Sequence, residues 1–536
     1  MHVTRKRLTA TILALSLPLL FGLFLPTRAL AVDYPDVQLA AFWNSDEDLS
    51  DTLYMSANGV DFQQLSTPYP ADGNYSDHVT GMPNYVHALH DPSLFYKNGT
   101  FWLASGYVQD QPGIGWRFVP MFGSSKDLVH WSYPNSGSPT NAGVTQLPEG
   151  TYDNGKYDTA GADAFADTDG TVWMVTTLGW YGANHGQPTN DTMHPYILKV
   201  AGLEPGADQA SNPGAQPRAS FGDLTPINLP VGGSNWLDPS LFKEGDTYYL
   251  SIKKDGITNQ IYSTKDLNRA GDPGAWTLVN ANVVTGYEGP SLTKYQGQYF
   301  MYTDKLKDYP AGSADGTAGT FVTQSGNLWN GWGNTRRITT TNVQGRSIPN
   351  RHGTVITVTD PQAKAVIFAQ RERAGYGAFE PGKNGWVQEN GKTYWYDNGI
   401  RAVSKEVYDP ASDAWYWFDA DGTMAKNKDV YIPSGSKWVR YDENGHMRKG
   451  EDWRYGAWYW FDPTTGQMIK GFVFVPSNGG KWVFYDYTTG KMTYGLARID
   501  NAWYYFDTVT GAMQKGSVYV PDWGSRHWFD PVTGRG

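Results

Sequence analysis

The apolar and polar positions of this chain fall in short runs separated by turn residues, and the clearest run lies at residues 287–304. It opens with Glu288 before Gly-Pro, turns at Gln296-Gly297 and continues as the aromatic segment 299–302. Short aromatic-rich runs bounded by Gly, Asn and Pro are typical of β-hairpins. This stretch therefore predicts a hairpin whose first strand begins with a carboxylate.

Two other stretches, residues 90–103 and 237–250, have the same layout, with Asp91 and Asp238 in place of the glutamate. Each reads Asp-Pro-Ser-Leu-Phe, then a turn that contains glycine, then an aromatic strand. We expect one structural unit to be repeated, with an acid at the same place in each copy.

A second type of hairpin alternates with these acid-bearing segments, here called heads. It contains Ser-Lys-Asp-Leu within residues 123–131 and Ser-Thr-Lys-Asp-Leu within residues 261–267. One head and one such hairpin make a four-stranded unit, and repeats of this size are typical of β-propellers. The segments around Asp163 and His352 supply two further heads, so we expect five blades. The fifth head lacks a closing hairpin downstream, and residues 37–66 are predicted to supply it, which removes the exposed sheet edge.

A different and shorter repeat occupies the C-terminal part of the chain. Each copy has an aromatic cluster, an Asp, a turn and a Gly, and the copies recur about every 22 residues. The Asp residues are Asp397, Asp419, Asp442, Asp462, Asp486, Asp507 and Asp530. A unit this small cannot bury its own apolar face, so the copies must stack into a β-hairpin solenoid. We predict an all-β chain, with a five-bladed β-propeller at 32–374, a linker at 375–388 and the solenoid at 389–536.

The composition agrees with this picture and excludes several classes of protein. At 536 residues the chain is too long for one ordinary domain. Aromatic residues make up 15%, with 61 Gly and 32 Pro, which favours turn-rich β architecture or sugar-binding surfaces. The net charge of −10 disfavours nucleic acid and anionic membranes as partners. Because the chain has no cysteine, disulfides, thiolate metal sites and a cysteine nucleophile are excluded.

Residues 1–31 have the pattern of a signal peptide. A basic stretch at 5–7 precedes an apolar run at 8–25, and a small-x-small cleavage site ends at Ala31. The run approaches the length of a membrane anchor, but Pro18 inside it and the cleavage site favour removal. We therefore expect an exported protein whose mature chain has no transmembrane segment. Export without cysteine favours a Gram-positive host.

The three acids give the predicted propeller a chemistry. A residue that begins the first strand of a blade faces the central axis, so Asp91, Asp238 and Glu288 are expected to converge. Hydrolysis of a glycosidic bond needs one protonated and one ionised carboxyl group, and a third carboxylate nearby raises the pKa of the acid. The alternative is that Asp-Pro is a common turn device, but two such heads followed by Glu-Gly-Pro favour catalysis.

The order Asp-Pro-Ser, Asp-Pro-Ser, Glu-Gly-Pro, with Ser-Lys-Asp-Leu-x-x-Trp between, resembles glycoside hydrolase family 43 over roughly residues 37–372. The family consists of five-bladed propellers, inverting enzymes that act on arabinan, arabinoxylan and related pentose glycans. The resemblance implies that Asp91 is the general base and Glu288 the general acid. It also implies that Asp238 tunes the pKa of the acid and orients it.

Three further residues take roles from the same resemblance. His352, in Arg-His-Gly-Thr-Val, resembles the fifth-blade histidine of arabinan-acting members, which lies in the central channel near a cation such as calcium. The alternative for His352 is a packed or hydrogen-bonded histidine. Asp163 is aligned with a second-blade acid that shapes the substrate site, and Trp180 lies in a loop expected to offer an aromatic face to a sugar. The reaction requires no cofactor.

The C-terminal copies resemble the choline-binding and glucan-binding repeats of Gram-positive surface proteins. Trp and Tyr faces between neighbouring hairpins can cage a quaternary ammonium or stack on a sugar. The alternative is that these aromatics only pack the solenoid. We expect the repeats to bind cell-wall choline or glucan and to hold the protein noncovalently at the wall.

Taken together, these features predict a secreted, wall-associated glycosidase. The favoured activity is that of an α-L-arabinofuranosidase or arabinan hydrolase, with β-xylosidase second. A fructan-hydrolase-like propeller is disfavoured because the sequence lacks Arg-Asp-Pro and Trp-Asn-Asp-Pro patterns. The remaining alternative is a non-catalytic carbohydrate-binding surface protein with a decayed propeller site.

Overall fold

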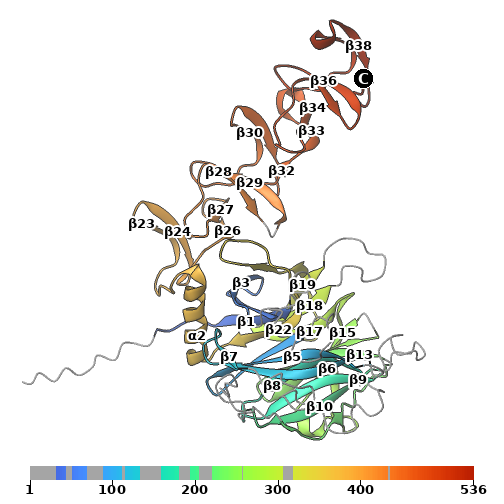
Figure 1. Cartoon of the computed structure of the whole chain (residues 1–536), viewed down its shortest axis with the longest axis vertical. Helices are drawn as coiled ribbons and strands as arrows, with labels where there is room; N and C mark the ends of the chain where they lie inside the picture. Colours follow the sequence, from blue (N-terminus) through green and yellow to red (C-terminus); the bar gives the residue numbers. More distant parts are fainter. Residues whose placement is uncertain are drawn as a thin grey trace, which may run out of the picture. The chain divides into compact units, whose positions relative to one another are not determined.

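Antiparallel strands dominate the computed structural model of the protein (Figure 1). The structure describes residues 32–43, 51–68, 89–111, 115–132, 158–179, 193–203, 220–233, 235–255, 258–305, 318–432 and 435–536. The described strands form five sheets of four or five strands and seven small sheets of two or three strands. The predicted all-β class is therefore confirmed. No helix among the described residues has the length and apolar character needed to cross a membrane.

Four of the larger sheets are each built from strands that follow one another in the sequence. The first contains β4 (Leu89–Lys97), β5 (Thr100–Gln111), β6 (Gly115–Ser125) and β7 (Trp131–Ser132). The second contains β8 (Asp158–Ala166), β9 (Val172–Gly179), β10 (His194–Ala201), β11 (Ser220–Phe221) and β12 (Thr225–Pro226). The third contains β13 (Trp236–Glu244), β14 (Thr247–Lys254), β15 (Thr258–Thr264) and β16 (Thr277–Thr285). The fourth contains β17 (Glu288–Tyr295), β18 (Gln298–Lys305), β19 (Gly319–Ser325) and β20 (Gly333–Arg337).

The fifth sheet joins strands from the two ends of this region. Strand β22 (Arg351–Val358) pairs antiparallel with β1 (Val37–Trp43). The sheet continues through β2 (Asp51–Ser56) and β3 (Asp61–Ser66) to β21 (Thr339–Thr341), which pairs parallel with β3. The prediction that the N-terminal hairpin pairs with the segment around His352 is confirmed. This pairing covers an edge of β22 that would otherwise be open to other chains.

The first strands of the five sheets contact one another in a closed order: β4 with β8, β8 with β13, β13 with β17, β17 with β22, and β22 with β4. A buried apolar cluster lies between each successive pair of sheets, for example one with Phe95 and Met174 and another with Tyr54 and Tyr302. Each sheet therefore buries both of its faces against its neighbours, which explains why so many strand positions are apolar on both sides.

The chain leaves these sheets through α2 (Pro361–Arg371), the only α-helix among the described residues. Asp360 caps the helix by accepting a hydrogen bond from the Ala363 amide at 2.8 Å. A π-helical turn (Glu372–Tyr376) follows. The segment predicted as a linker begins in this turn and includes most of β23 (Gly385–Glu389).

The C-terminal part consists of hairpins of about equal size (Figure 1). In order they contain β23 with β24 (Lys392–Asp397) and β25 (Ile400–Arg401), β26 (Lys405–Asp409) with β27 (Ala414–Phe418), β28 (Lys428–Ile432) with β29 (Lys437–Tyr441), β30 (Gly450–Arg454) with β31 (Ala457–Phe461) and β32 (Met468–Ile469), β33 (Gly471–Val475) with β34 (Lys481–Tyr485), β35 (Gly495–Ile499) with β36 (Ala502–Phe506), and β37 (Gly516–Val520) with β38 (Ser525–Phe529).

Several consecutive hairpins are tied together by a backbone hydrogen bond and by methionine packing. The amide of Met492, which follows β34, donates to the carbonyl oxygen of Trp458 in β31 at 2.9 Å. The Met492 sulfur lies where a side chain on Gly511 would be, 2.4 Å from the position of its Cβ. Met–Gly contacts of this kind recur along the array. They explain why a glycine stands in each turn: a larger residue would push the neighbouring methionine away.

Candidate functional site

The heads of the first strands share a β-bulge, which sets the direction of their side chains. In four of the sheets two residues of the first strand are skipped in the register at this point. The first skipped residue has a left-handed φ in each case: 52° at Asp91, 53° at Gly161, 54° at Asp238 and 59° at Gly289. Asp and Gly tolerate this conformation better than most residues, and a bulge re-aims side chains at the end of a sheet.

This shared geometry corrects the prediction that every copy carries its acid at the same place. Asp91 and Asp238 occupy the left-handed position, but in the fourth sheet that position is Gly289, and Glu288 precedes it. In the second sheet Gly161 takes the position and Asp163 lies two residues later, where the other heads have a serine. Asp-Pro-Ser and Glu-Gly-Pro-Ser are thus offset by one residue.

The heads of neighbouring sheets touch one another. A Cβ on Gly161 would lie 2.7 Å from the Cα of Asp238, and a Cβ on Gly289 would lie 2.5 Å from the His352 ring. The Gly289 amide also donates a hydrogen bond to Oδ2 of Asp238 at 3.1 Å. Only a residue without a side chain allows backbones to approach this closely.

The three predicted acids come together in one network, here called the acid cluster: Asp91, Asp238 and Glu288 with Lys253 and His352. His352 Nδ1 lies 2.8 Å from Asp91 Oδ1. Lys253 Nζ, at the end of β14, lies 2.8 Å from Glu288 Oε2 and 3.8 Å from Asp238 Oδ2. The side chains of the three acids are 11–21% exposed, so they remain accessible from solvent.

A second cation, Arg351, reaches Glu288 from the fifth sheet. Its Nη2 lies 3.6 Å from Glu288 Oε1, and its Nε lies 2.7 Å from Oδ2 of the fully buried Asp304. Burial raises the pKa of Asp304 to about 6, with Arg351 opposing the rise and Glu288 adding to it. Glu288 therefore has a lysine and an arginine within salt-bridge distance.

Two members of the acid cluster, His352 and Asp238, have raised pKa values for different reasons. Burial by itself would lower the pKa of His352, but the contact with Asp91 raises it to about 10, with help from Asp238. His352 is therefore protonated at neutral pH and places a positive charge against Asp91. Burial raises the pKa of Asp238, and the neighbouring charges of Glu288 and Asp91 raise it further, while Lys253 and His352 oppose the shift.

The role of His352 beside a cation such as calcium stays a prediction. In the structure its Nδ1 lies 2.8 Å from Oδ1 of Asp91. Among the residues that the structure describes, no group of three His, Asp or Glu side chains is arranged to hold a metal ion.

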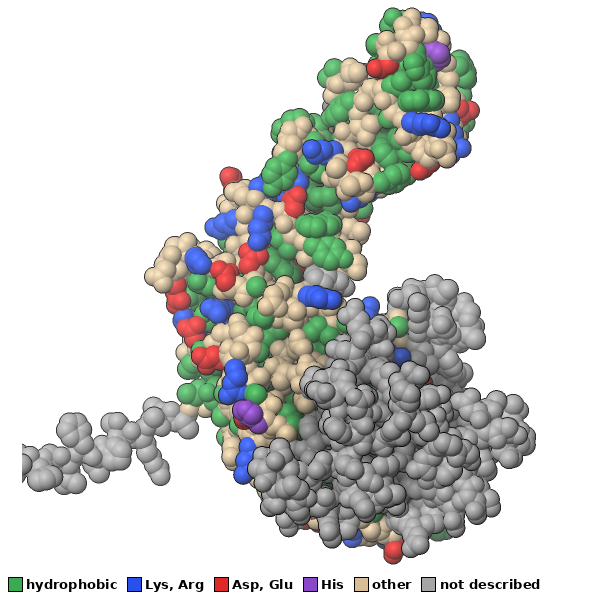
Figure 2. Space-filling view, in the orientation of Figure 1, with side chains coloured by type: hydrophobic (Ala, Val, Ile, Leu, Met, Phe, Trp, Pro, Cys, Tyr) green, Lys and Arg blue, Asp and Glu red, His purple; other side chains and the backbone are tan. Residues whose placement is uncertain are grey.

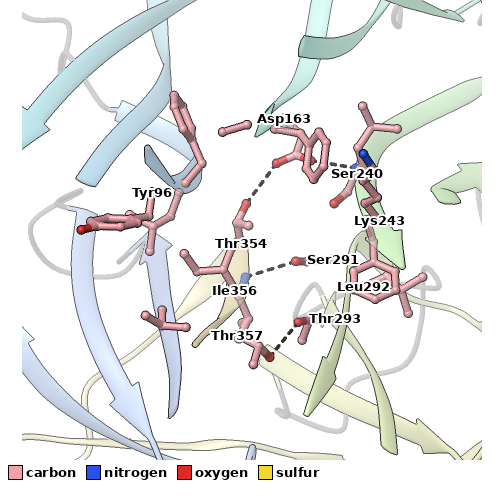
Figure 3. A pocket seen from close by; sticks show the side chains of 18 of the residues that line it. Tyr96, Asp163, Ser240, Lys243, Ser291, Leu292, Thr293, Thr354, Ile356 and Thr357 are labelled. Carbon is pink, nitrogen blue, oxygen red and sulfur yellow. Dashed lines mark hydrogen bonds between the residues drawn. The ribbon is translucent and has the colours of Figure 1, made fainter. Parts of the chain in front are cut away.

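Asp163 lies in the ring of first strands as a tie between sheets (Figure 3). Its carboxylate accepts hydrogen bonds from Ser93 Oγ at 2.6 Å and from the Leu241 amide at 2.8 Å, with Thr354 Oγ1 at 3.4 Å. These partners belong to three other sheets. Burial raises the pKa of Asp163, and the hydrogen bonds oppose that rise. The carboxylate thus connects neighbouring sheets, and the predicted role of Asp163 in substrate binding stays a prediction.

A cavity of about 310 Å³ extends from Asp163 between the first strands. Hydroxyl groups line much of it and bond across neighbouring strands, as Thr293 does with Thr357 at 3.0 Å (Figure 3). Ser291 Oγ accepts from the Val355 amide at 3.1 Å in the same way. These hydrogen bonds connect the first strands of neighbouring sheets around the cavity.

Trp180, predicted to face a sugar, lies outside the described residues. The sequence patterns did not single out Lys253 or Arg351 as site residues. A signal for Lys253 exists, since it is a cation that directly follows the uncharged strand residues Leu250-Ser251-Ile252. Arg351 adjoins His352 in the same motif, and nothing in the sequence separates it from a surface arginine.

The C-terminal hairpins form a second candidate site through paired aromatic rings. Trp453 and Trp458 lie 5.5 Å apart between ring centroids, and Trp503 and Trp523 lie 5.4 Å apart. Similar pairs occur on other hairpins. Many of these rings are exposed, with Trp458 at 37% and Trp503 at 38%, and hydrophobic side chains are visible across this part of the molecule in Figure 2.

Contiguous exposed aromatic side chains on a protein surface often mark a ligand-binding site. Their ring faces suit a cation or a sugar. The packing alternative applies to other aromatics of the same hairpins, such as Tyr485 and Phe506, which are fully buried between neighbouring repeats. The hairpins therefore use one set of aromatics for packing and expose another.

Comparison with known proteins identifies the last part of the array. A family model described as a choline-binding repeat matches residues 493–535. The choline-binding domain of CbpL from Streptococcus pneumoniae is 26% identical, over 29% of this chain and 78% of that chain, with a TM-score of 0.24. Choline binding protein F from the same species is 17% identical, over 53% of this chain and 91% of that chain, with a TM-score of 0.24.

The modular Cpl-1 endolysin, solved with a peptidoglycan analogue, is 24% identical over 25% of this chain and 39% of that chain, with a TM-score of 0.18. TM-scores this low do not establish a shared architecture. No curated protein matches the chain. The predicted resemblance of the C-terminal copies to choline-binding repeats is confirmed at residues 493–535.

Proposed function

We propose that the C-terminal hairpins bind choline groups of a cell-wall polymer and hold an exported protein at the surface of a Gram-positive cell. The observation that carries this proposal is the match of residues 493–535 to a choline-binding repeat. The exposed aromatic pairs support it, because a quaternary ammonium is attracted to the faces of Trp and Tyr rings. In this proposal residues 1–31 are the removed signal peptide and the repeats span residues 389–536.

Retention of the mature chain on immobilised choline tests the proposal. The parent protein should be retained and should elute with free choline. Trp458→Ala combined with Trp503→Ala should weaken retention, on the order of 10-fold in affinity, because each exposed ring contributes up to about 2 kcal/mol to cation binding.

The matched control is Trp329→Ala, since Trp329 is 65% exposed but lies between β19 and β20, far from the repeats in the sequence. It should be retained as well as the parent. Failure of the parent to bind choline, together with binding to a glucan matrix, would replace choline by glucan as the ligand.

We also propose that the five larger sheets are the blades of a five-bladed β-propeller at residues 32–374. The closed order of contacts among the first strands supports it, as does the pairing of β1 with β22. A short linker at 375–388 then separates the propeller from the repeats.

The second candidate function is glycoside hydrolysis at the acid cluster by an inverting mechanism. The favoured substrates are arabinan-type α-L-arabinofuranosides, with β-xylosides second. The meeting of Asp91, Asp238 and Glu288 in one network favours it. In the proposed roles Asp91 activates water as general base, Glu288 protonates the leaving oxygen, and Asp238 adjusts the pKa of Glu288.

The charges around these acids suit the roles unequally. Asp91 lies against the protonated His352, a partner that suits a general base. Glu288 has Lys253 and Arg351 within 4 Å of its carboxylate oxygens, whereas a general acid gives a proton to the leaving oxygen. In this proposal a bound sugar displaces Lys253 from Glu288. Without such a change the acid cluster binds carbohydrate and does not hydrolyse it. This alternative fits a non-catalytic surface protein.

Release of nitrophenol from nitrophenyl α-L-arabinofuranoside and β-xyloside by the mature chain tests the second candidate. Glu288→Gln should lower kcat/KM by about 100-fold or more, because general acid catalysis contributes at least that much. Asp246→Asn, a change at an exposed carboxylate of the β13–β14 turn, should leave the rate unchanged. Equal rates for Glu288→Gln and the parent would remove Glu288 from the mechanism.

A further inference from the structure

One hairpin of the array carries an arginine where the others have an aromatic ring. In this hairpin Arg440 of β29 lies two positions before the repeat aspartate, Asp442. The corresponding residues of the other copies are Trp395, Trp417, Trp460, Phe484, Tyr505 and Trp528. The Arg440 side chain is 1% exposed. Placing a charge at such a buried position is expensive unless partners surround it.

Two carboxylates from consecutive hairpins hold the Arg440 guanidinium. Asp429, opposite Arg440 in the same hairpin, binds Nε at 2.6 Å and Nη2 at 2.9 Å in a bidentate arrangement. Asp452, in β30 of the next hairpin, binds Nη1 at 2.9 Å. The arginine therefore connects the hairpin of β28 and β29 to the hairpin of β30 and β31.

Three aromatic rings complete the surroundings, and all of them come from the next hairpin. The guanidinium carbon lies 4.3 Å from the ring centroid of Tyr459, 5.0 Å from that of Phe461 and 5.4 Å from that of Tyr455. These distances lie within the range of cation–π attraction. A cation thus sits between aromatic faces and carboxylates, in an arrangement that resembles a binding site for a small organic cation.

The interface between two consecutive hairpins is here called a step of the array. The steps before and after the one at Arg440 are built differently. At the preceding step Trp417 packs against Val439 and Tyr441. At the following step Trp460 packs against Val483 and Tyr485. Each of those interfaces fills this position with an indole ring and carries one Lys–Glu pair beside it, Lys437–Glu406 at 3.6 Å and Lys481–Glu451 at 4.0 Å. The step at Arg440 instead has a guanidinium bound by two carboxylates and lacks the ring.

We propose that Arg440 is a built-in ligand. Its guanidinium fills an aromatic and carboxylate cage between two consecutive hairpins, so that this step of the array closes without a soluble cation. When the side chain is cut back, the vacated cage accepts a small guanidinium or ammonium compound. The claim concerns the cage itself and holds whether or not choline is the ligand of the remaining repeats.

Thermal unfolding of the mature chain carrying Arg440→Ala tests the proposal. The transition of the repeats should fall by roughly 10 °C, because Asp429 loses the arginine that binds it and Asp452 loses one of its two arginine partners, Arg448 being the other. Millimolar methylguanidinium should restore much of this loss in a saturable way. Methylurea, which has a similar shape and no charge, should restore none of it.

Arg498→Ala is the matched control, because Arg498 is an exposed arginine on β35 of the same array. It should change the transition little and respond to neither compound. If Arg440→Ala fails to fold, Arg440→Lys carries the test, and it should be less stable than the parent because lysine cannot bind in a bidentate, stacked manner. Rescue by methylurea equal to that by methylguanidinium, or a lysine variant as stable as the parent, would overturn the proposal.

Discussion

At the scale of single residues, the acid cluster depends on the charge of His352. This histidine lies against Asp91, and that contact outweighs the effect of burial and raises the pKa of His352 to about 10. The ordinary value in an unfolded chain is about 6.5. The imidazolium form is therefore favoured by folding, and it keeps a positive charge among three carboxylates at neutral pH.

This shift predicts a pH dependence of stability. The stabilisation from the raised pKa is fully present below about pH 6.5 and is lost as the pH rises toward about 10, by up to about 1.4 kcal/mol per pH unit. Denaturant unfolding at a series of pH values measures this loss. Asp91→Asn should flatten the dependence in this window, since it removes the main partner of His352.

His130→Gln is the control for the loss of a histidine. The His130 side chain is 87% exposed in the turn after β6, so its replacement should leave the dependence of the parent intact. A parent protein whose stability does not change between about pH 6.5 and 10 would contradict the charged state assigned to His352.

Some residues of the acid cluster could be predicted from the sequence, and others could not. Asp91, Asp238 and Glu288 could be selected from their motifs, and the structure places them in one network. Their offset could not be foreseen, because it depends on which residue of the bulge takes the left-handed φ. The cations beside Glu288 come from other strands, and a linear pattern does not reveal such neighbours.

At the scale of elements, the hairpins were predictable because turn residues mark them. Ser-x-Asp-Leu turns close through the aspartate, as where Asp127 Oδ1 accepts from the amides of Val129 and His130. The aspartates of the C-terminal copies act alike, as where Asp462 Oδ1 accepts from Thr464 and Thr465. Local hydrogen bonds of this kind follow from a few adjacent residues, so the sequence alone identifies them.

Other elements depend on distant partners and were less predictable. The segment 375–388 has linker composition, yet most of β23 lies within it, because Trp386 pairs with Trp395 across the first hairpin. Asp163 has the appearance of a site residue, and its hydrogen bonds to other sheets are not visible in the sequence. Arg440 has the appearance of a surface residue, yet Asp429 and Asp452 bury it.

At the scale of the whole molecule, two kinds of repetition are combined in one chain. Five larger sheets contact in a closed order and bring carboxylates from three of them together. The hairpins that follow bond to neighbouring hairpins and leave aromatic rings exposed. The first arrangement favours a site where distant segments meet, and the second favours an extended surface with repeated, similar sites.

The proposed role joins these parts as a surface protein: the repeats hold the wall polymer, and the larger sheets present the acid cluster to carbohydrate. The exposed aromatic pairs are the feature on which this role depends. Their number along the array implies that binding to a polymer with many choline groups is stronger than binding to one choline.

The most direct test is sedimentation of the mature protein with purified cell walls that carry choline, compared with walls from which choline has been removed. The account predicts that the protein sediments with the choline-bearing walls, that millimolar free choline releases it, and that the choline-free walls leave it in solution. Equal binding to both kinds of wall, or binding to neither, would contradict the account.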